Sequence, residues 1–227
     1  MPLIEIEGLD GSGKETQVAL LMESLTQLGY DIKGISYPVY DESAYLIQQY
    51  LGGAYGEDLS QLNPKSISLY YTVNRIHDYL KNWQSNYKDG DVIIADRYVN
   101  SNLIHQGCQM KNEKEVKAYK KWLEELEHKH CGLPKPDFVF FLDVPPKEQK
   151  KILKSRQQQK SKQDKDILES NLAYNEKCRN FVLDHAKEWG WIVIERDEIE
   201  KVQNKILEHL LPKLIYTKEP EIKFGER

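Results

Sequence analysis

Cysteine is scarce in this chain of 227 residues. Cys108, Cys131 and Cys178 are an odd number, and no two of them have the CxxC spacing. This pattern favours free thiols in a reducing compartment over a disulfide framework, so we expect a cytoplasmic protein. His128 and His130 lie near Cys131 in the sequence, but no second cluster of ligands accompanies them, and we expect no metal there.

Three further features are missing. There is no apolar run long enough to span a bilayer and no signal-peptide pattern after Met1, so we expect neither a membrane span nor export. An excess of positive charge is missing too, because the formal net charge is −4. We therefore expect no general binding to nucleic acid or to a membrane surface. Hydrophobic residues make up 40% of the chain, enough for the core of one α/β domain, with or without an inserted lid.

A glycine-rich turn follows the first apolar run. Leu3, Ile4 and Ile6 give a short strand pattern, and the segment 8–16 (GLDGSGKET) separates it from a stretch with helical spacing. The spacing Gly8-x4-Gly13-Lys14, between a strand and a helix, is that of a phosphate-binding loop. Its N–H groups, the helix dipole and the lysine charge all favour phosphate. A plain strand–turn–helix connection is the alternative that we consider weaker.

One position departs from this pattern. The residue after the lysine is expected to be Ser or Thr, which holds Mg²⁺, and here it is Glu15, with Thr16 one residue later. A carboxylate is favoured by the helix dipole in a first turn, yet phosphates repel it. Either Glu15 reaches Mg²⁺ itself, or it turns outward and Asp96 with water carries most of the metal coordination.

The remaining chain alternates between strand and helix patterns. We expect strands near 32–37, 92–95, 138–142 and 191–195, with helices between them and a last helix that ends near Leu211–Pro212. This order predicts a mostly parallel sheet covered on both faces. We expect one domain over 1–212, a polar lid at about 155–167, and a charged tail at 213–227 whose role stays open.

The longest helix has a clear start. Asn63-Pro64 is typical of an N-cap followed by the first helical residue. The apolar positions of this helix fall on one face, which we expect to be buried: Ile67, Tyr70, Val73, Ile76 and Leu80. Tyr71 and Arg75 also share a face. They are either core and surface residues, or an aromatic plate and a guanidinium suited to a nucleobase, and helix spacing does not choose between these.

Charged residues stand at the carboxyl ends of the expected strands, where parallel sheets bind ligands. Asp96-Arg97-Tyr98 ends the run 92–95, and Asp143 ends the run 138–142. An ordinary ion pair at a strand end is one interpretation of the first group. The other has Arg97 gripping a second phosphate and Asp96 near Mg²⁺ or the accepting oxygen. Two anionic groups held in line are what phosphoryl transfer requires.

These motifs together resemble the thymidylate kinase family, from about residue 2 to residue 211. The resemblance is carried by GLDGSGK at 8–14, Tyr37-Pro38, Tyr71-x3-Arg75, Asp96-Arg97-Tyr98, Ser101-Asn102 and LPKPD at 133–137. It implies a P-loop α/β fold in three layers with a five-stranded parallel sheet, and a homodimer formed through helices. It also implies transfer of the γ-phosphoryl group of MgATP to dTMP, giving dTDP and ADP in dTTP biosynthesis, so that ATP, dTMP and Mg²⁺ are the expected ligands.

The resemblance implies roles for particular residues. ATP phosphates would be held by Gly8, Leu9, Asp10, Gly11, Ser12, Gly13, Lys14, Glu15 and Thr16, and the catalytic group would be Asp10, Lys14, Asp96, Arg97 and Arg156. The dTMP site would comprise Tyr37, Pro38, Tyr40, Tyr71, Arg75, Arg97, Tyr98, Asn102, His105 and Gln106. Within it, Tyr71 would stack on the base, Arg75 with Asn102 would read its edge, and His105 would disfavour a ribose.

Members of this family differ in where the catalytic arginine lies. One type carries it in the phosphate loop, and the other has glycine there and an arginine in the lid. Gly11 occupies the loop position here, so the chain resembles the lid type, with Arg156 as the candidate arginine. Another nucleotide or nucleoside kinase on the same fold, or a nucleotide-binding protein without turnover, are the alternative functions.

Overall fold

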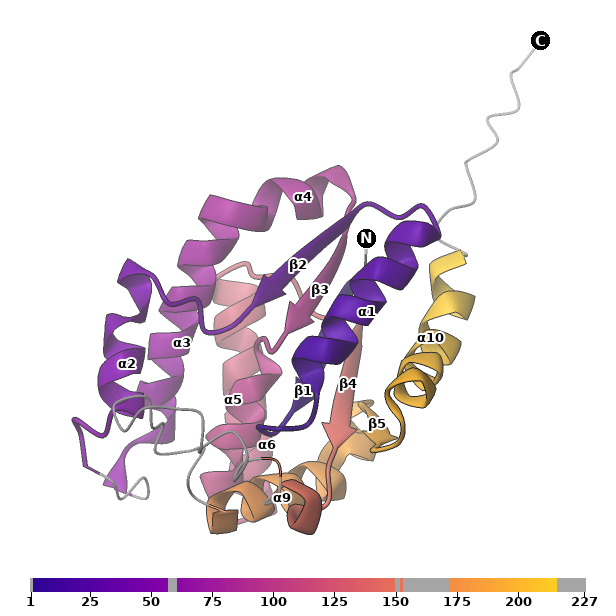
Figure 1. Cartoon of the computed structure of the whole chain (residues 1–227). Coiled ribbons are helices and arrows are strands. Elements are labelled where there is room, and N and C mark those ends of the chain that lie inside the picture. Colours follow the sequence, from indigo (N-terminus) through magenta and orange to yellow (C-terminus); the bar gives the residue numbers. More distant parts are fainter. Residues whose placement is uncertain (1, 57–60, 150–151, 153–171, 216–227) are drawn as a thin grey trace.

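Five parallel strands form one sheet in the order β2-β3-β1-β4-β5 (Figure 1). The structure is a computed structural model that describes residues 2–56, 61–149, 152 and 172–215. The strands are β1 (Leu3–Gly8), β2 (Ile32–Ser36), β3 (Val92–Asp96), β4 (Phe138–Asp143) and β5 (Ile192–Glu195). Leu3 of the central strand pairs with Ile93, and Ile4 pairs with Phe138. The predicted five-stranded parallel sheet is confirmed.

Helices cover both faces of this sheet (Figure 1). One face packs against α1 (Lys14–Gln27) and α10 (Ile199–Ile215), through side chains such as Leu21 and Ile206. The other face packs against α5 (Asn100–His105), α6 (Glu113–Glu124) and α9 (Leu172–Trp189), through side chains such as Leu103, Leu123 and Val182. The predicted three layers are confirmed. Of the described helices, none has both the length and the apolar composition needed to cross a membrane.

The remaining described elements connect these layers. After β2 come η1 (Glu42–Ala44), α2 (Tyr45–Leu51), α3 (Pro64–Asp78), η3 (Tyr79–Trp83) and α4 (Gln84–Asp89). Two short turns, η4 (Gly107–Gln109) and η5 (Glu125–His130), extend α5 and α6. Because each parallel strand needs a crossover to reach the next, these helices lie between strands and leave the carboxyl ends of the strands open.

Local signals in the sequence place several helix ends correctly. The side chain of Asn63 accepts hydrogen bonds from the N–H groups of Lys65 (2.9 Å) and Ser66 (3.4 Å), with Pro64 as the first residue of α3. Gly29 follows α1 with φ 79°, a left-handed conformation that glycine adopts without strain. The predicted N-cap is confirmed, because it depends on backbone bonds within a few residues.

The predicted buried face of α3 is only partly confirmed. Ile67 is buried, and Tyr70 and Ile76 pack against the core clusters. Val73 is 56% exposed and Leu80, just after this helix, is 63% exposed. The face that is buried is mostly polar and comprises Ile67, Ser68, Thr72, Asn74, Arg75 and Asp78. Hydrophobic spacing identified a helix here but placed Val73 and Leu80 in the interior wrongly, because polar side chains with hydrogen-bond partners occupy much of the buried face.

The end of the last helix also differs from the prediction. α10 continues through Pro212 to Ile215, although proline usually ends a helix. Leu210 and Leu214 on either side of it are 0% and 1% exposed, so burial of this apolar face holds the last turn in place. The expected lid at 155–167, including Arg156, lies outside the described residues, as does the tail beyond residue 215.

Candidate functional site

The phosphate loop lies between β1 and α1, at the carboxyl edge of the central strand. Its backbone requires glycine at two positions, since Gly11 and Gly13 have φ 81° and 89°. A Cβ on Gly8 would lie 2.6 Å from Ser12 Oγ and 2.9 Å from the Leu142 carbonyl, so a side chain does not fit there. No side chain caps the first turn of α1, and its N–H groups remain available for phosphate oxygens.

The ammonium group of Lys14 lies folded over this loop. Lys14 Nζ donates to the carbonyl oxygens of Gly8 (2.8 Å) and Leu9 (3.2 Å). Burial, together with the neighbouring positive charge of Arg97, lowers the pKa of Lys14 to about 8. This lowered pKa means that the protonated form of Lys14 is destabilised. An anion bound at the loop would stabilise the protonated form again, because it would supply a negative charge close to the buried ammonium.

Arg97 joins this loop to the end of the neighbouring strand. Its backbone is in the left-handed region, with φ 66°, which is uncommon for a residue other than glycine. Its Nη2 donates to Asp10 Oδ1 at 2.6 Å, and its Nη1 donates to the Gly8 carbonyl at 3.4 Å. Asp96 beside it has a buried Oδ1 with no hydrogen-bond partner among the described residues.

These groups surround a polar cavity of about 190 Å³. Lys14 and Arg97 contribute positive charge to its wall, and Asp10, Asp96 and Glu15 contribute negative charge. Its other lining residues are Gly11, Gly13, Thr16, Ser36 and Tyr37. A cavity with cations, carboxylates and a glycine-rich loop can hold phosphate oxygens together with a divalent cation.

A second cavity, of about 250 Å³, lies on the other side of the same loop. It shares Gly11, Gly13 and Thr16 with the first cavity, but much of its wall is aliphatic: Leu142, Ile152, Ile194, Ile199 and Val202. Gln17, Asp143, Arg196 and Asp197 add polar groups. The sequence analysis overlooked this cavity, although its position at the ends of β4 and β5 follows from the rule that places ligands at carboxyl ends.

The predicted base-reading residues come together in the interior. Arg75 Nη2 donates to Asn102 Oδ1 at 3.0 Å, and both residues are 1% exposed. Tyr71 lies half-buried on the same helix as Arg75, and Gln106 is buried after α5. Tyr40, by contrast, is 63% exposed, so the structure does not bury it with this group.

Tyr37 and Tyr98 occupy the core. Tyr37 Oη donates to Asp78 Oδ2 at 2.7 Å, and Tyr98 Oη donates to the Pro134 carbonyl at 3.2 Å. Their rings are 5.7 Å apart. These side chains support the turns that carry Pro38 and Arg97, and their predicted contact with a ligand stays a prediction.

His105 stacks against Tyr174 of α9, with ring centroids 6.1 Å apart. Burial and the charge of Arg97 lower the pKa of His105 to about 3. The imidazole is therefore neutral at physiological pH. Its Nδ1 is buried without a hydrogen-bond partner among the described residues, so His105 offers a neutral polar group beside Arg97.

Three buried glutamates near these residues were missed by the sequence analysis. Glu5 and Glu7 of β1 are both 0% exposed, and so is Glu127 of η5. Glu5 accepts from the Asn100 backbone N–H (2.9 Å), and Glu7 accepts from the Tyr98 backbone N–H (3.2 Å). For Glu5 and Glu7 the sequence did hold a signal, because they occupy alternate positions inside an apolar strand. A charged side chain there is costly to bury unless it forms hydrogen bonds.

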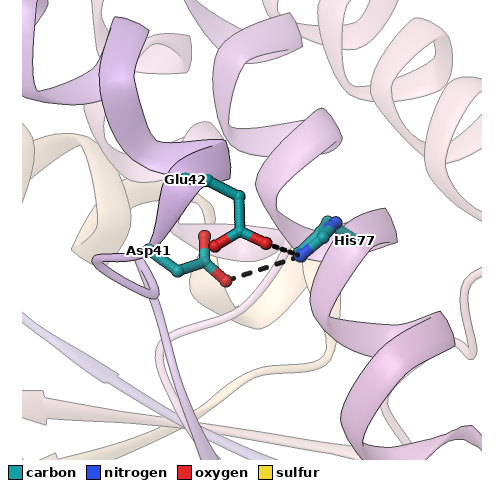
Figure 2. A group of neighbouring side chains, drawn as sticks. All are labelled: Asp41, Glu42 and His77. Carbon is teal, nitrogen blue, oxygen red and sulfur yellow. Dashed lines mark ion pairs between the residues drawn. The ribbon is translucent and has the colours of Figure 1, made fainter.

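Asp41, Glu42 and His77 form a group of potential metal ligands among the described residues. Figure 2 shows both carboxylates directed at His77 Nε2, at 3.6 Å from Asp41 and 3.3 Å from Glu42. The Lys81 ammonium lies 3.1 Å from Glu42 Oε1 and already neutralises that carboxylate. We therefore describe this group as ion pairs that fasten η1 to α3.

The fold and the loop define the class as the P-loop kinases that act on small nucleotides. The chain belongs to the thymidylate kinase family, whose family model, described as "Thymidylate kinase", matches residues 6–206. It is 31% identical to probable thymidylate kinase 1 of Saccharolobus solfataricus, over 92% of this chain and 94% of that protein. It is 27% identical to thymidylate kinase of Mycobacterium tuberculosis, over 86% of this chain and 92% of that protein.

A solved structure shows the same fold. The crystal structure of thymidylate kinase from Ehrlichia chaffeensis matches with a TM-score of 0.63 at 22% identity, covering 92% of this chain and 98% of that one. At this level of identity the likeness concerns the fold alone.

The pKa of Lys14 predicts how triphosphate binding depends on pH. Lys14 holds its proton below about pH 8 and loses it above, so the affinity for ATP should weaken about tenfold between roughly pH 7 and pH 9. Isothermal titration at the two pH values measures this. Lys14→Gln should bind ATP more weakly and equally at both pH values. Equal affinity of the unmodified protein at both would contradict the prediction.

Proposed function

We propose that this chain transfers the γ-phosphoryl group of ATP to dTMP, giving ADP and dTDP. The observation that carries this proposal is the Arg97–Asp10 pair, which puts a half-buried guanidinium next to the phosphate loop. A donor triphosphate on the loop and an acceptor phosphate on Arg97 would then lie in adjoining parts of one polar cavity. In-line phosphoryl transfer needs this proximity, together with positive charge around the moving group.

We assign the donor nucleotide to the phosphate loop and the cavity behind it. The loop N–H groups and Lys14 would neutralise the phosphates, and the aliphatic side chains of the second cavity would cover the adenine ring. Adenine is flat and largely apolar on its faces, which suits Ile194 and Ile199 at the cavity wall. Arg156, in the lid sequence, stays the candidate for stabilising charge on the transferred group.

We assign dTMP to the side of the loop that faces Arg97 and α3. Arg97 would bind its phosphate with a planar fork of donors, and Arg75 with Asn102 would read the edge of the base. Tyr71 would stack on the base. The neutral ring of His105, backed by Tyr174, would lie against the sugar and occupy the space of a 2′ hydroxyl.

A magnesium ion fits the residues that line this cavity. Asp96 has a buried carboxylate oxygen without a partner among the described residues, and Thr16 and Glu15 line the same cavity. Mg²⁺ prefers such oxygen ligands, together with water and substrate phosphates. When bound, the ion would neutralise charge on the phosphates, and Asp96 is our leading protein ligand for it.

The acceptor is tested with a coupled assay of ADP formation. With ATP and Mg²⁺, we expect dTMP to have the highest kcat/KM among dTMP, dUMP, dCMP and AMP. Donors on Arg75 and Asn102 suit the C4 carbonyl that dTMP and dUMP carry and that dCMP and AMP lack. A preference for another monophosphate would instead support a different nucleotide kinase on this fold. ATP binding with no transfer to any of the four would support a non-catalytic nucleotide-binding protein.

The role of Glu15 is tested by restoring the usual residue type. Glu15 lines the cavity but is also exposed on the first turn of α1. We expect its carboxylate to face solvent, and Glu15→Ser to keep activity within a fewfold of the unmodified protein. The measurement is kcat against Mg²⁺ concentration. A folded but inactive Glu15→Ser, or one that needs far more Mg²⁺, would mean that Glu15 is itself a metal ligand.

We also propose that the protein is a homodimer through α2 and α3. Leu69, Val73 and Leu80 are exposed by 43%, 56% and 63% and follow each other at spacings of four and seven, along one side of the helical segment. Tyr45 and Leu46 at the start of α2 are exposed as well. The ion pairs of Figure 2 hold η1, just before α2, against α3. Exposed apolar surface of this kind marks an interaction site.

A charge placed in this apolar stripe should separate the subunits. We expect Val73→Asp to be monomeric by size-exclusion chromatography with light scattering, and the unmodified protein to be dimeric. Leu28→Asp is the matched control, because Leu28 is 54% exposed but lies beyond α1, away from the stripe. An unmodified protein that is monomeric, or a dimeric Val73→Asp, would show that this surface is not the interface.

A further inference from the structure

Glu127 is a buried charge that the proposed chemistry has not used. It lies in η5, the wide turn that continues α6, and is 0% exposed. A buried carboxylate costs several kcal/mol unless close partners compensate for the lost water. The hydrogen-bond partners of Glu127 therefore indicate its role in the site.

Both carboxylate oxygens of Glu127 bind the same arginine. Arg75 Nε donates to Oε2 at 3.2 Å, and Arg75 Nη2 donates to Oε1 in a short bond. Thr72, one turn earlier on α3, donates from Oγ1 to Oε1 at 2.7 Å. Two parallel bonds to a guanidinium fix its plane as well as its position. Burial alone would lower the pKa of Arg75, but the Glu127 carboxylate outweighs it and raises the pKa.

The other side of the guanidinium faces α5. Arg75 Nη1 donates to the Tyr98 carbonyl at 3.3 Å, and Nη2 donates to Asn102 Oδ1 at 3.0 Å. Of the five N–H groups of an arginine, these bonds leave one on Nη1 without an acceptor in the part of the chain that the structure describes. Asn102 is held by its oxygen, and its buried Nδ2 has no partner among the described residues. The cluster thus ends in donors that no described residue satisfies and that an added acceptor could.

We propose that Glu127 is a positioning residue for recognition of the acceptor base. It holds the Arg75 guanidinium in one plane, and through Arg75 it fixes the orientation of the Asn102 amide. The remaining donors, on Arg75 Nη1 and Asn102 Nδ2, would then bind the carbonyl oxygen at C4 of thymine. Cytosine carries an amino group at C4, which is itself a donor and would not accept these bonds. This inference rests on the proposed function.

Glu127→Gln tests the proposal, because it keeps the shape of the side chain but removes the charge and one acceptor. We expect the KM for dTMP to rise about ten- to a hundredfold, with kcat and the KM for ATP changed less than about threefold. The preference for dTMP over dCMP should fall by at least about tenfold. A purely structural role would lower the melting temperature without moving this preference.

Ser68→Ala is the matched control for stability. Ser68 is also on α3 and 0% exposed, and its Oγ shares a hydrogen bond of 2.6 Å with Tyr119 Oη of α6. The variant should lower the melting temperature but leave the KM for dTMP and the base preference unchanged. Together the two variants separate loss of contact between α3 and α6 from loss of base recognition.

Three outcomes decide the matter. A folded Glu127→Gln with unchanged KM for dTMP and unchanged base preference would overturn the proposal. If Glu127→Gln does not fold, Glu127→Asp keeps the charge but withdraws it by one methylene, and a folded Glu127→Asp must show the same shift in KM or the proposal fails. If the unmodified protein does not phosphorylate dTMP, the proposed function fails first, and that result is distinct from failure of the positioning role.

Discussion

The ion pair between Arg97 and Asp10 connects the two halves of the site. Their loops follow β3 and β1, which are neighbours in the sheet. Parallel pairing in register, with Ile6 opposite Asp96, brings the two loops to the same edge, and the ion pair then orients the guanidinium across the cavity. In this position Arg97 has a left-handed backbone, which is unfavourable for a residue other than glycine. The surrounding turn must therefore stabilise a conformation that few non-glycine residues adopt.

Two glutamates of β1 stabilise that turn by accepting hydrogen bonds from it. Glu5 and Glu7 project from the same side of the strand, since strand side chains alternate, and both receive hydrogen bonds from residues 98–101. Burial and the neighbouring Glu7 raise the pKa of Glu5 well above its usual value. The folded protein therefore holds a proton on Glu5 more tightly than the unfolded chain does, and the stability that this gives is lost as the pH rises through the raised pKa.

Local chemistry explains how much of this could be predicted from the sequence. The phosphate loop, the Asn63 cap and the buried strands depend on residues close together in the chain, so spacing alone located them. The aliphatic lining of the second cavity and the partners of Glu127 depend on which elements pack together, and spacing holds no such information. Glu127 was overlooked because a segment with His128, His130 and other charged residues is typical of an exposed turn. Its burial depends on Arg75, which lies 52 positions earlier in the sequence.

The error at α3 shows why a functional helix misleads hydrophobic periodicity. Its interior face carries Thr72 and Arg75, whose hydrogen bonds to Glu127 compensate for burial. Its apolar residue Val73, and Leu80 of η3 just after it, are left outside. A helix that must present donors to a ligand on one side and apolar surface to a partner subunit on the other inverts the usual pattern. The inversion is therefore consistent with both proposals for α3, base recognition inside and subunit contact outside.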